Sequence, residues 1–117
     1  MSREPWSDLL PELPRDADGD AIRRLVHEGT DLAEPMSVDF FVAVPDERIG
    51  RAVAAAAEPR GYRATVEKDH TDPSWTCYCA KTMLVTHEAV TAAQRELDEI
   101  ARPLGGKADG WGTFGNA

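Results

Sequence analysis

Three carboxylates at alternate positions, Asp16, Asp18 and Asp20, are the first candidates for chemistry in this chain of 117 residues. Carboxylates at positions 1, 3 and 5 open the calcium-binding loop of an EF-hand. That loop also needs a glycine at position 6 and a bidentate glutamate at position 12, where this sequence has Ala21 and His27. We therefore expect no calcium site and interpret the run as the acidic N-terminus of a helix.

Cys77 and Cys79 are one residue apart in a segment with the composition of a strand. Structural zinc sites favour C-x-x-C pairs on turns, a geometry that a C-x-C pair in mid-strand does not supply. The separation of two such positions along a strand also resists a disulfide. We predict two free thiols that behave as small apolar side chains, on the helix-facing side of a sheet with Trp75. The sequence thus predicts neither metal nor cofactor, and free thiols indicate the cytoplasm.

No motif for nucleophilic catalysis accompanies these thiols. His27, His70 and His87 are expected on a helix face, in a loop and at a helix start, and the sequence has no recognised serine or cysteine elbow. Gly105 and Gly106 precede a strand, whereas a phosphate-binding loop precedes a helix. We predict that the chain is not an enzyme.

The charge balance favours a protein partner. Asp and Glu outnumber Lys and Arg by 21 to 13, which gives a net charge of −8 and opposes attraction to phosphate backbones. The longest apolar run, residues 52–57, is too short to cross a bilayer, and the first residues do not resemble a secretory signal. We expect basic or amphipathic protein partners, no direct nucleic acid and no membrane.

The hydrophobic pattern predicts one α+β domain over residues 16–117, preceded by a proline-containing, partly ordered arm over residues 1–15. The expected helices run from about Asp18 to Glu28 with Asp16 or Asp18 as the cap, from Pro45 to Pro59, and from Thr86 to Leu104. The expected strands cover residues 36–44, 62–67 and 75–84, and a short strand follows Gly106. Without the first helix this order is the split βαβ pattern of ferredoxin-like sandwiches, a four-stranded antiparallel sheet of order 4-1-3-2.

Strand alternation predicts an exposed row of aromatic side chains on the sheet face that lacks helices. In the last strand Trp111 alternates with small residues. If the small residues face the helices, where they allow close packing, Trp111 lies on the open face. There it would neighbour Phe41 of the first strand and Tyr78 of the third. The alternative is that Trp111 packs under the first helix or the N-terminal arm. The predicted protein-binding residues are Trp111, Asp109, Phe41, Tyr78 and Asp39.

The closing segment Asp109-Gly110-Trp111-Gly112-Thr113-Phe114 resembles the motif that ends the conserved domain of the RraB family, the protein regulators of ribonuclease E activity. Gly29 after the first helix, Gly61-Tyr62 before the second strand and the cysteine-containing third strand fit the same resemblance, which covers about residues 17–114. It implies a small cytoplasmic non-enzyme with a ferredoxin-like core that binds the endoribonuclease and inhibits or redirects RNA turnover. Better-known members continue into a strongly acidic tail, whereas this sequence ends three residues after Phe114.

An RNA-binding domain is the alternative from another class. RNA-recognition domains share this strand order and stack bases on aromatics of the first and third strands, where Phe41 and Tyr78 are expected. Asp39 and Glu67 would lie on the same face, and the basic-aromatic ribonucleoprotein motif is missing. Protein binding is therefore favoured, and an open apolar face would serve a second copy of the chain or a foreign protein equally well.

Overall fold

The structure, a computed structural model, describes residues 16–69 and 74–115. The predicted arm over residues 1–15 and the loop residue His70 lie outside the described residues. The helices are α1 (Ala17–His27), α2 (Glu47–Ala57) and α3 (His87–Ala101), and short 3-10 turns, η2 (Glu58–Arg60) and η3 (Arg102–Leu104), continue the last two. The strands are β1 (Met36–Val44), β2 (Arg63–Lys68), β3 (Trp75–Met83) and β4 (Lys107–Gly112).

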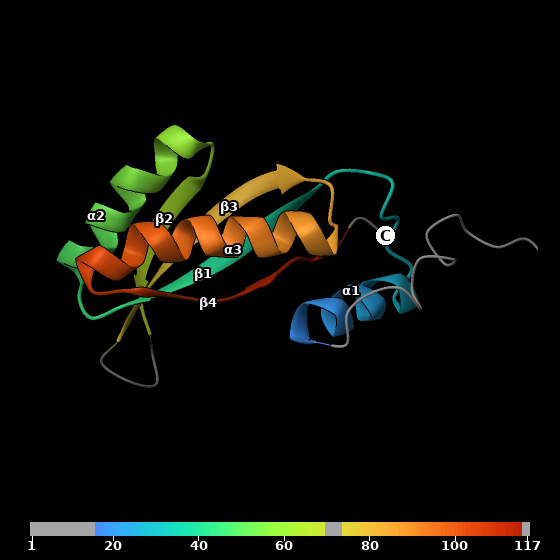
Figure 1. Cartoon of the computed structure of the whole chain (residues 1–117), viewed down its shortest axis with the longest axis horizontal. Coiled ribbons are helices and arrows are strands. Elements are labelled where there is room, and N and C mark those ends of the chain that lie inside the picture. Colours follow the sequence, from blue (N-terminus) through green and yellow to red (C-terminus); the bar gives the residue numbers. More distant parts are fainter. Residues whose placement is uncertain (1–15, 70–73, 116–117) are drawn as a thin grey trace, which may run out of the picture.

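The four strands form one antiparallel sheet in the order β2-β3-β1-β4, which is the order that the sequence predicts. Helix α2 packs over β2 and β3, and helix α3 packs over β4 and β1 (Figure 1). The predicted α+β class is therefore confirmed. Each observed element agrees with its predicted range to within a few residues.

Polar caps define where the three helices begin. The side chains of Asp16, Asp46 and Thr86 accept hydrogen bonds of 2.8 to 3.0 Å from the backbone N–H three residues later. Such a cap satisfies one of the N–H groups that the first helical turn leaves without a partner. Asp16 is thus the cap of α1, as one of the two sequence alternatives had it, and the acidic run serves the helix.

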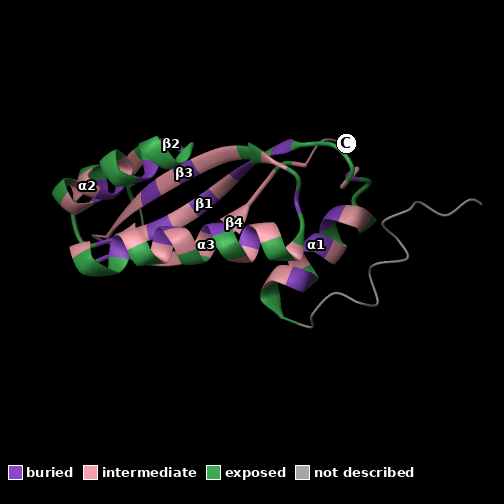
Figure 2. Cartoon of the chain, turned by 45° about the horizontal axis from the view of Figure 1, so that its top comes forward, coloured by how far each residue is buried: buried purple, intermediate pink, exposed green. Residues whose placement is uncertain are grey.

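The core lies between the sheet and the two covering helices. Val38, Phe40 and Val42 of β1 are at most 1% exposed. Phe40 and Val42 pair with the buried Cys79 and Cys77 of β3. The ring of Phe40 packs edge-to-face on that of Tyr62, with centroids 6.1 Å apart. Figure 2 shows these buried positions alternating with partly exposed ones along β1 and β3. One sheet face is therefore the core, as alternation predicts.

Helix α1 lies beside the N-terminal half of α3, at the end of the sandwich farthest from α2 (Figures 1 and 2). Its apolar side chains Ile22 and Leu25 are 1% and 8% exposed and belong to the same core. The helix therefore extends the helical layer and does not cover the opposite face of the sheet.

Candidate protein-binding site

A β-bulge in β4 sets the direction of the side chains in the closing motif. Val42 of β1 lies opposite Ala108, but Phe40 lies opposite Trp111, so Asp109 and Gly110 together oppose one residue of β1. Gly110 has φ of +111°, in a region that side chains with a Cβ avoid. One extra residue on one strand shifts its alternation by one position, so that Ala108 and Trp111 both face the helices.

Trp111 is therefore not on the open face, and the prediction that it forms a row with Phe41 and Tyr78 is wrong. Its indole packs partly buried against the core, and its Nε1 donates a 2.9 Å hydrogen bond to Oδ1 of Asp18 in α1. The predicted row assumed unbroken alternation, which the bulge interrupts. The alternative expectation, that Trp111 packs under the first helix, describes the structure.

Asp18 connects three elements through its carboxylate. Besides the indole of Trp111, it accepts hydrogen bonds from Nε2 of Gln94 at 3.1 Å and from Oγ1 of Thr91 at 3.5 Å, both on α3. A second contact joins the same two helices at the start of α3, where Nε2 of His87 lies 3.0 Å from Oδ2 of Asp16, the cap of α1. The backbone N–H of Gly19, followed by the bond from His87, lowers the pKa of the Asp16 carboxyl. These contacts fix α1 on the sandwich.

The open face of the sheet carries an aromatic pair at its centre. Phe41 and Tyr78 lie opposite each other on β1 and β3, with ring centroids 5.6 Å apart and planes at 83°. A Cβ built on Gly112 would lie 3.4 Å from Cζ of Phe41, so this ring extends over the neighbouring strand β4. Both aromatic side chains are half-buried. The structure thus brings together two of the three predicted aromatics.

Charged side chains of both signs surround this pair. Asp39 lies opposite Ala80 and Gly112, one step along the same face, and Asp109 is exposed in the bulge. Arg63 of β2 donates a 3.3 Å hydrogen bond to Oγ of Ser37 across β3. Within residues 16–69 and 74–115 no helix lies over this face (Figures 1 and 2). We name the surface around Phe41, Tyr78, Asp39 and Asp109 the open-face patch.

Two exposed apolar side chains at one end of the sheet were not among the predicted site residues. Phe114 is fully exposed, and Leu84 is 48% exposed. Leu84 follows Met83, which pairs with Met36, and Oγ1 of Thr113 donates a 2.7 Å bond to the carbonyl of Ser37, so both flank the start of β1. Phe114 follows Gly112, the last residue of β4, so strand alternation does not set its direction.

The two thiols are free, buried and close together. Sγ of Cys77 lies 3.8 Å from Sγ of Cys79, and both residues are fully buried on the helix-facing side, opposite Val42 and Phe40. The hydrogen bond with Cys77 and burial raise the pKa of the Cys79 thiol. Among the described residues no group of three metal-binding side chains occurs. The sequence prediction of two small apolar side chains in the core is confirmed.

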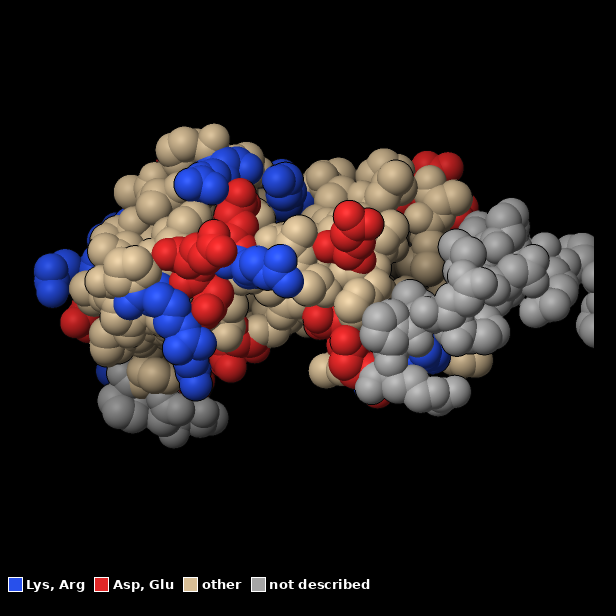
Figure 3. Space-filling model, in the orientation of Figure 1, with Lys and Arg blue, Asp and Glu red and all other residues tan. Residues whose placement is uncertain are grey.

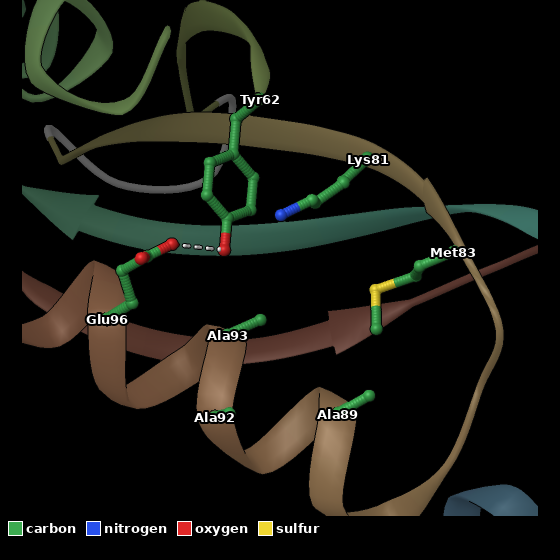
Figure 4. A pocket seen from close by; sticks show the side chains of 7 residues that line it. All are labelled: Tyr62, Lys81, Met83, Ala89, Ala92, Ala93 and Glu96. Carbon is green, nitrogen blue, oxygen red and sulfur yellow. Dashed lines mark hydrogen bonds between the residues drawn. The ribbon is translucent and has the colours of Figure 1, made fainter. Parts of the chain in front are cut away.

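A shallow groove of about 280 Å³ lies between β3 and α3, with Tyr62 at one end (Figure 4). The hydroxyl of Tyr62 donates a 2.9 Å hydrogen bond to Glu96, and the ammonium of Lys81 lies 4.9 Å from the centre of the Tyr62 ring. Burial and the Glu96 carboxylate raise the pKa of Tyr62. A tyrosine held neutral in this way supplies a packing surface and a hydrogen-bond donor, not a base.

The helix-covered face shows no large field of one charge. Figure 3 shows Lys and Arg side chains interspersed with Asp and Glu over α2 and α3. Several of them pair, as Arg60 does with Glu96 at 3.2 Å and Arg102 with Asp98 at 3.0 Å. In the part of the chain that the structure describes, no helix has the length and apolar character needed to span a membrane.

Four antiparallel strands, two covering helices and a sheet face that carries no helix among the described residues define a small α+β sandwich. The family model described as RraB, Regulator of ribonuclease activity B, matches residues 15–113, which is most of the chain. The chain belongs to the RraB family, a family of regulators of ribonuclease activity. The family membership that the resemblance predicts is thereby confirmed. A search of curated proteins found no match.

Proposed function

We propose that this protein is a non-catalytic cytoplasmic regulator that binds a ribonuclease E-type endoribonuclease through the open-face patch and modulates RNA turnover. Family membership supports the regulatory role. The observation that favours this surface is the edge-to-face pair of Phe41 and Tyr78 on a sheet face over which the described residues place no helix. Aromatic side chains at the centre of a patch are the usual anchors of a protein interface.

Carboxylates select the partner in this proposal. Asp39 and Asp109 flank the aromatic pair in a protein of net charge −8, so a basic segment of the nuclease would be attracted to the patch. Phe114, fully exposed beyond the end of β4, would add an apolar contact at the rim. Bound there, the chain would restrain the nuclease by blocking its surface or by favouring one of its conformations. Trp111 would act indirectly, by holding α1 in place.

Binding of the purified nuclease to immobilised protein tests the patch. The variant Phe41→Ala with Tyr78→Ala is expected to weaken binding tenfold or more, because two central anchors are removed. Thr82→Ala, on the same strand face but away from the pair, is the matched control and should bind like the parent. Thermal denaturation of each variant shows that it is folded. Equal binding by the double variant and the parent would exclude this patch as the nuclease site.

RNA binding is the alternative that the aromatic pair itself suggests, because its rings lie on the two central strands. The edge-to-face geometry at 83° argues against it, since both rings cannot lie flat under successive bases. Fluorescence anisotropy with single-stranded RNA distinguishes the two. Tight RNA binding that falls steeply with salt and is lost with Phe41→Ala would favour the RNA-binding function over the proposed one.

A further inference from the structure

The two edge strands of the sheet, β4 and β2, differ in how readily each could pair with a strand of another chain. Strand β4 carries the bulge at Asp109 and Gly110, and α1 packs beside its C-terminal end through Trp111. Strand β2 pairs with β3 over all six of its residues without a bulge. It has no proline and, within the described residues, no strand on its other side. An exposed regular edge of this kind offers a row of unpaired backbone N–H and C=O groups.

A groove runs along this edge under α2. Its volume is about 430 Å³, and it is lined by Arg51, Ala54 and Ala55 of α2, by Glu58 at the start of η2, and by Ala64, Thr65 and Val66 of β2. Gly50 lets α2 lie directly on β2, since a Cβ there would come within 2.6 Å of Cγ1 of Val66. In the next turn of α2 the small side chains of Ala54 and Ala55 lie at the edge, which leaves the hollow.

We propose that this edge pairs with β2 of a second copy of the chain, antiparallel and with the two-fold axis at Thr65. In that register Arg63 lies opposite Glu67 of the second copy, and Glu67 lies opposite its Arg63. Ala64 lies opposite Val66 on the helix side, and Thr65 lies opposite itself. Opposite charges and Thr–Thr pairs at facing positions stabilise antiparallel strands. Residues 63–67 of β2 are thus complementary to their own reverse.

Other symmetric registers lack this complementarity. Facing residues must point to the same side of the sheet, so the axis passes through a residue and never between two. An axis at Val66 would place Lys68 opposite Ala64 on the helix side and Thr65 opposite Glu67. Among pairs formed within β2, the axis at Thr65 is the one that places opposite charges and apolar side chains at facing positions.

Helix α2 shows the same self-complementarity. The residues that line the groove, at positions 51, 54, 55 and 58, lie on one helical face. A two-fold axis normal to the sheet makes the two copies of α2 antiparallel, which places Ala54 beside Ala55 of the second copy and Arg51 beside its Glu58. Arg51 is 73% exposed and held by one 3.5 Å bond to Glu47, so it is free to turn toward the new partner.

The resulting dimer has one continuous eight-stranded sheet. All helices lie on one side, and two copies of the Phe41 and Tyr78 pair lie on the other, so that a partner with two binding segments would be held by both. The dimer does not depend on the proposed function. If the protein dimerises but does not bind the nuclease, only the proposed function fails. If it binds the nuclease but stays monomeric, only the dimer proposal fails.

Sedimentation equilibrium over a range of concentrations tests the register with charge variants. Glu67→Arg alone and Arg63→Glu alone each create two like-charged pairs and are expected to weaken dimerisation about tenfold. The double variant Arg63→Glu with Glu67→Arg restores both pairs and should dimerise like the parent. A mixture of the two single variants should form the heterodimer. Glu99→Arg, exposed on α3, is the control for a change in net charge.

A crosslink tests the same axis independently. Thr65→Cys would bring two thiols to facing positions about 5 Å apart between Cα atoms, within disulfide range. Mild oxidation should give a covalent dimer, whereas Thr82→Cys, exposed on β3, should not. A monomer at all concentrations, or a dimer that neither the charge variants nor the crosslink affects, would overturn the proposal. In the second case another surface holds the two copies.

Discussion

The indole N–H of Trp111 donates a 2.9 Å hydrogen bond to Oδ1 of Asp18, 93 residues earlier in the chain. This bond joins the last strand to the first helix, and Gln94 of α3 donates to the same carboxylate. The closing motif thus has a structural role. It bulges the edge strand and turns its tryptophan inward to hold α1.

Removal of this bond should destabilise the fold. Asp18→Ala leaves the indole N–H without its acceptor, and the amide of Gln94 keeps only its bond to the carbonyl of Val90. We therefore expect the free energy of unfolding to fall by about 2 kcal/mol. Asp20→Ala, on the same helix and bonded only to Arg23, should change it by less than about 0.5 kcal/mol. Urea denaturation measures both. Equal stability of the two variants would show that the Trp111 bond contributes nothing.

The bulge itself depends on a glycine. Gly110→Ala puts a Cβ on a residue with φ of +111°, which should cost about 1 to 2 kcal/mol of stability. No atom lies within 4 Å of that Cβ, so the loss would come from the backbone and not from a clash. Asp109→Ala, the preceding exposed residue, is the control. A melting temperature unchanged by Gly110→Ala would argue against the positive φ.

Ionisation of the Tyr62 hydroxyl is expected to lower the stability of the fold at alkaline pH. Burial and Glu96 raise its pKa in the folded protein above the usual 10.0, so the stabilisation is complete below pH 10 and is lost as the pH rises through the folded value. Tyr62→Phe removes the hydroxyl, lowers stability at pH 7 by about 1 kcal/mol and flattens the decline above pH 10. Denaturation from pH 7 to 11 compares it with Tyr78→Phe, the other tyrosine. The same decline in both variants would contradict the assignment to Tyr62.

Protonation of the Asp98 carboxylate is expected to lower the stability of the fold at acidic pH. The backbone N–H of Ala108 and then the side chain of Arg102 lower its pKa from 3.8, so its stabilisation is present above about that pH and lost as the pH falls further. Asp98→Asn should be less stable than the parent at pH 7 and should lose less stability between pH 5 and 2. Thermal denaturation across that range measures the difference. Parallel curves would place the acid sensitivity in other carboxylates.

Local pattern was sufficient for the elements of this fold. Alternation in β1, apolar spacing in α3 and the caps at Asp46 and Thr86 are properties of neighbouring residues, and the structure follows them. The burial of Cys77 and Cys79 also follows from alternation, because β3 continues without interruption. The strand order agreed with the pattern typical of this order of elements.

Local pattern could not predict which face of the sheet the side chains of the closing segment occupy. Asp109-Gly110 contains the glycine that a bulge needs, but a glycine in a strand is also compatible with regular pairing. Whether the chain bulges there depends on β1 across the sheet and on α1, whose Asp18 supplies an acceptor for the indole. Both partners are distant in the sequence.

The sequence by itself determined the class of fold, the order of its elements, the acidic character and the family to which the closing motif points. Only the tertiary structure decided which aromatics share a surface. Phe41 and Tyr78 do, because two regular strands keep them in register, whereas Trp111 lies on the opposite face. The physical reason is that strand alternation has a period of two, so that a single extra residue reverses every side chain that follows it.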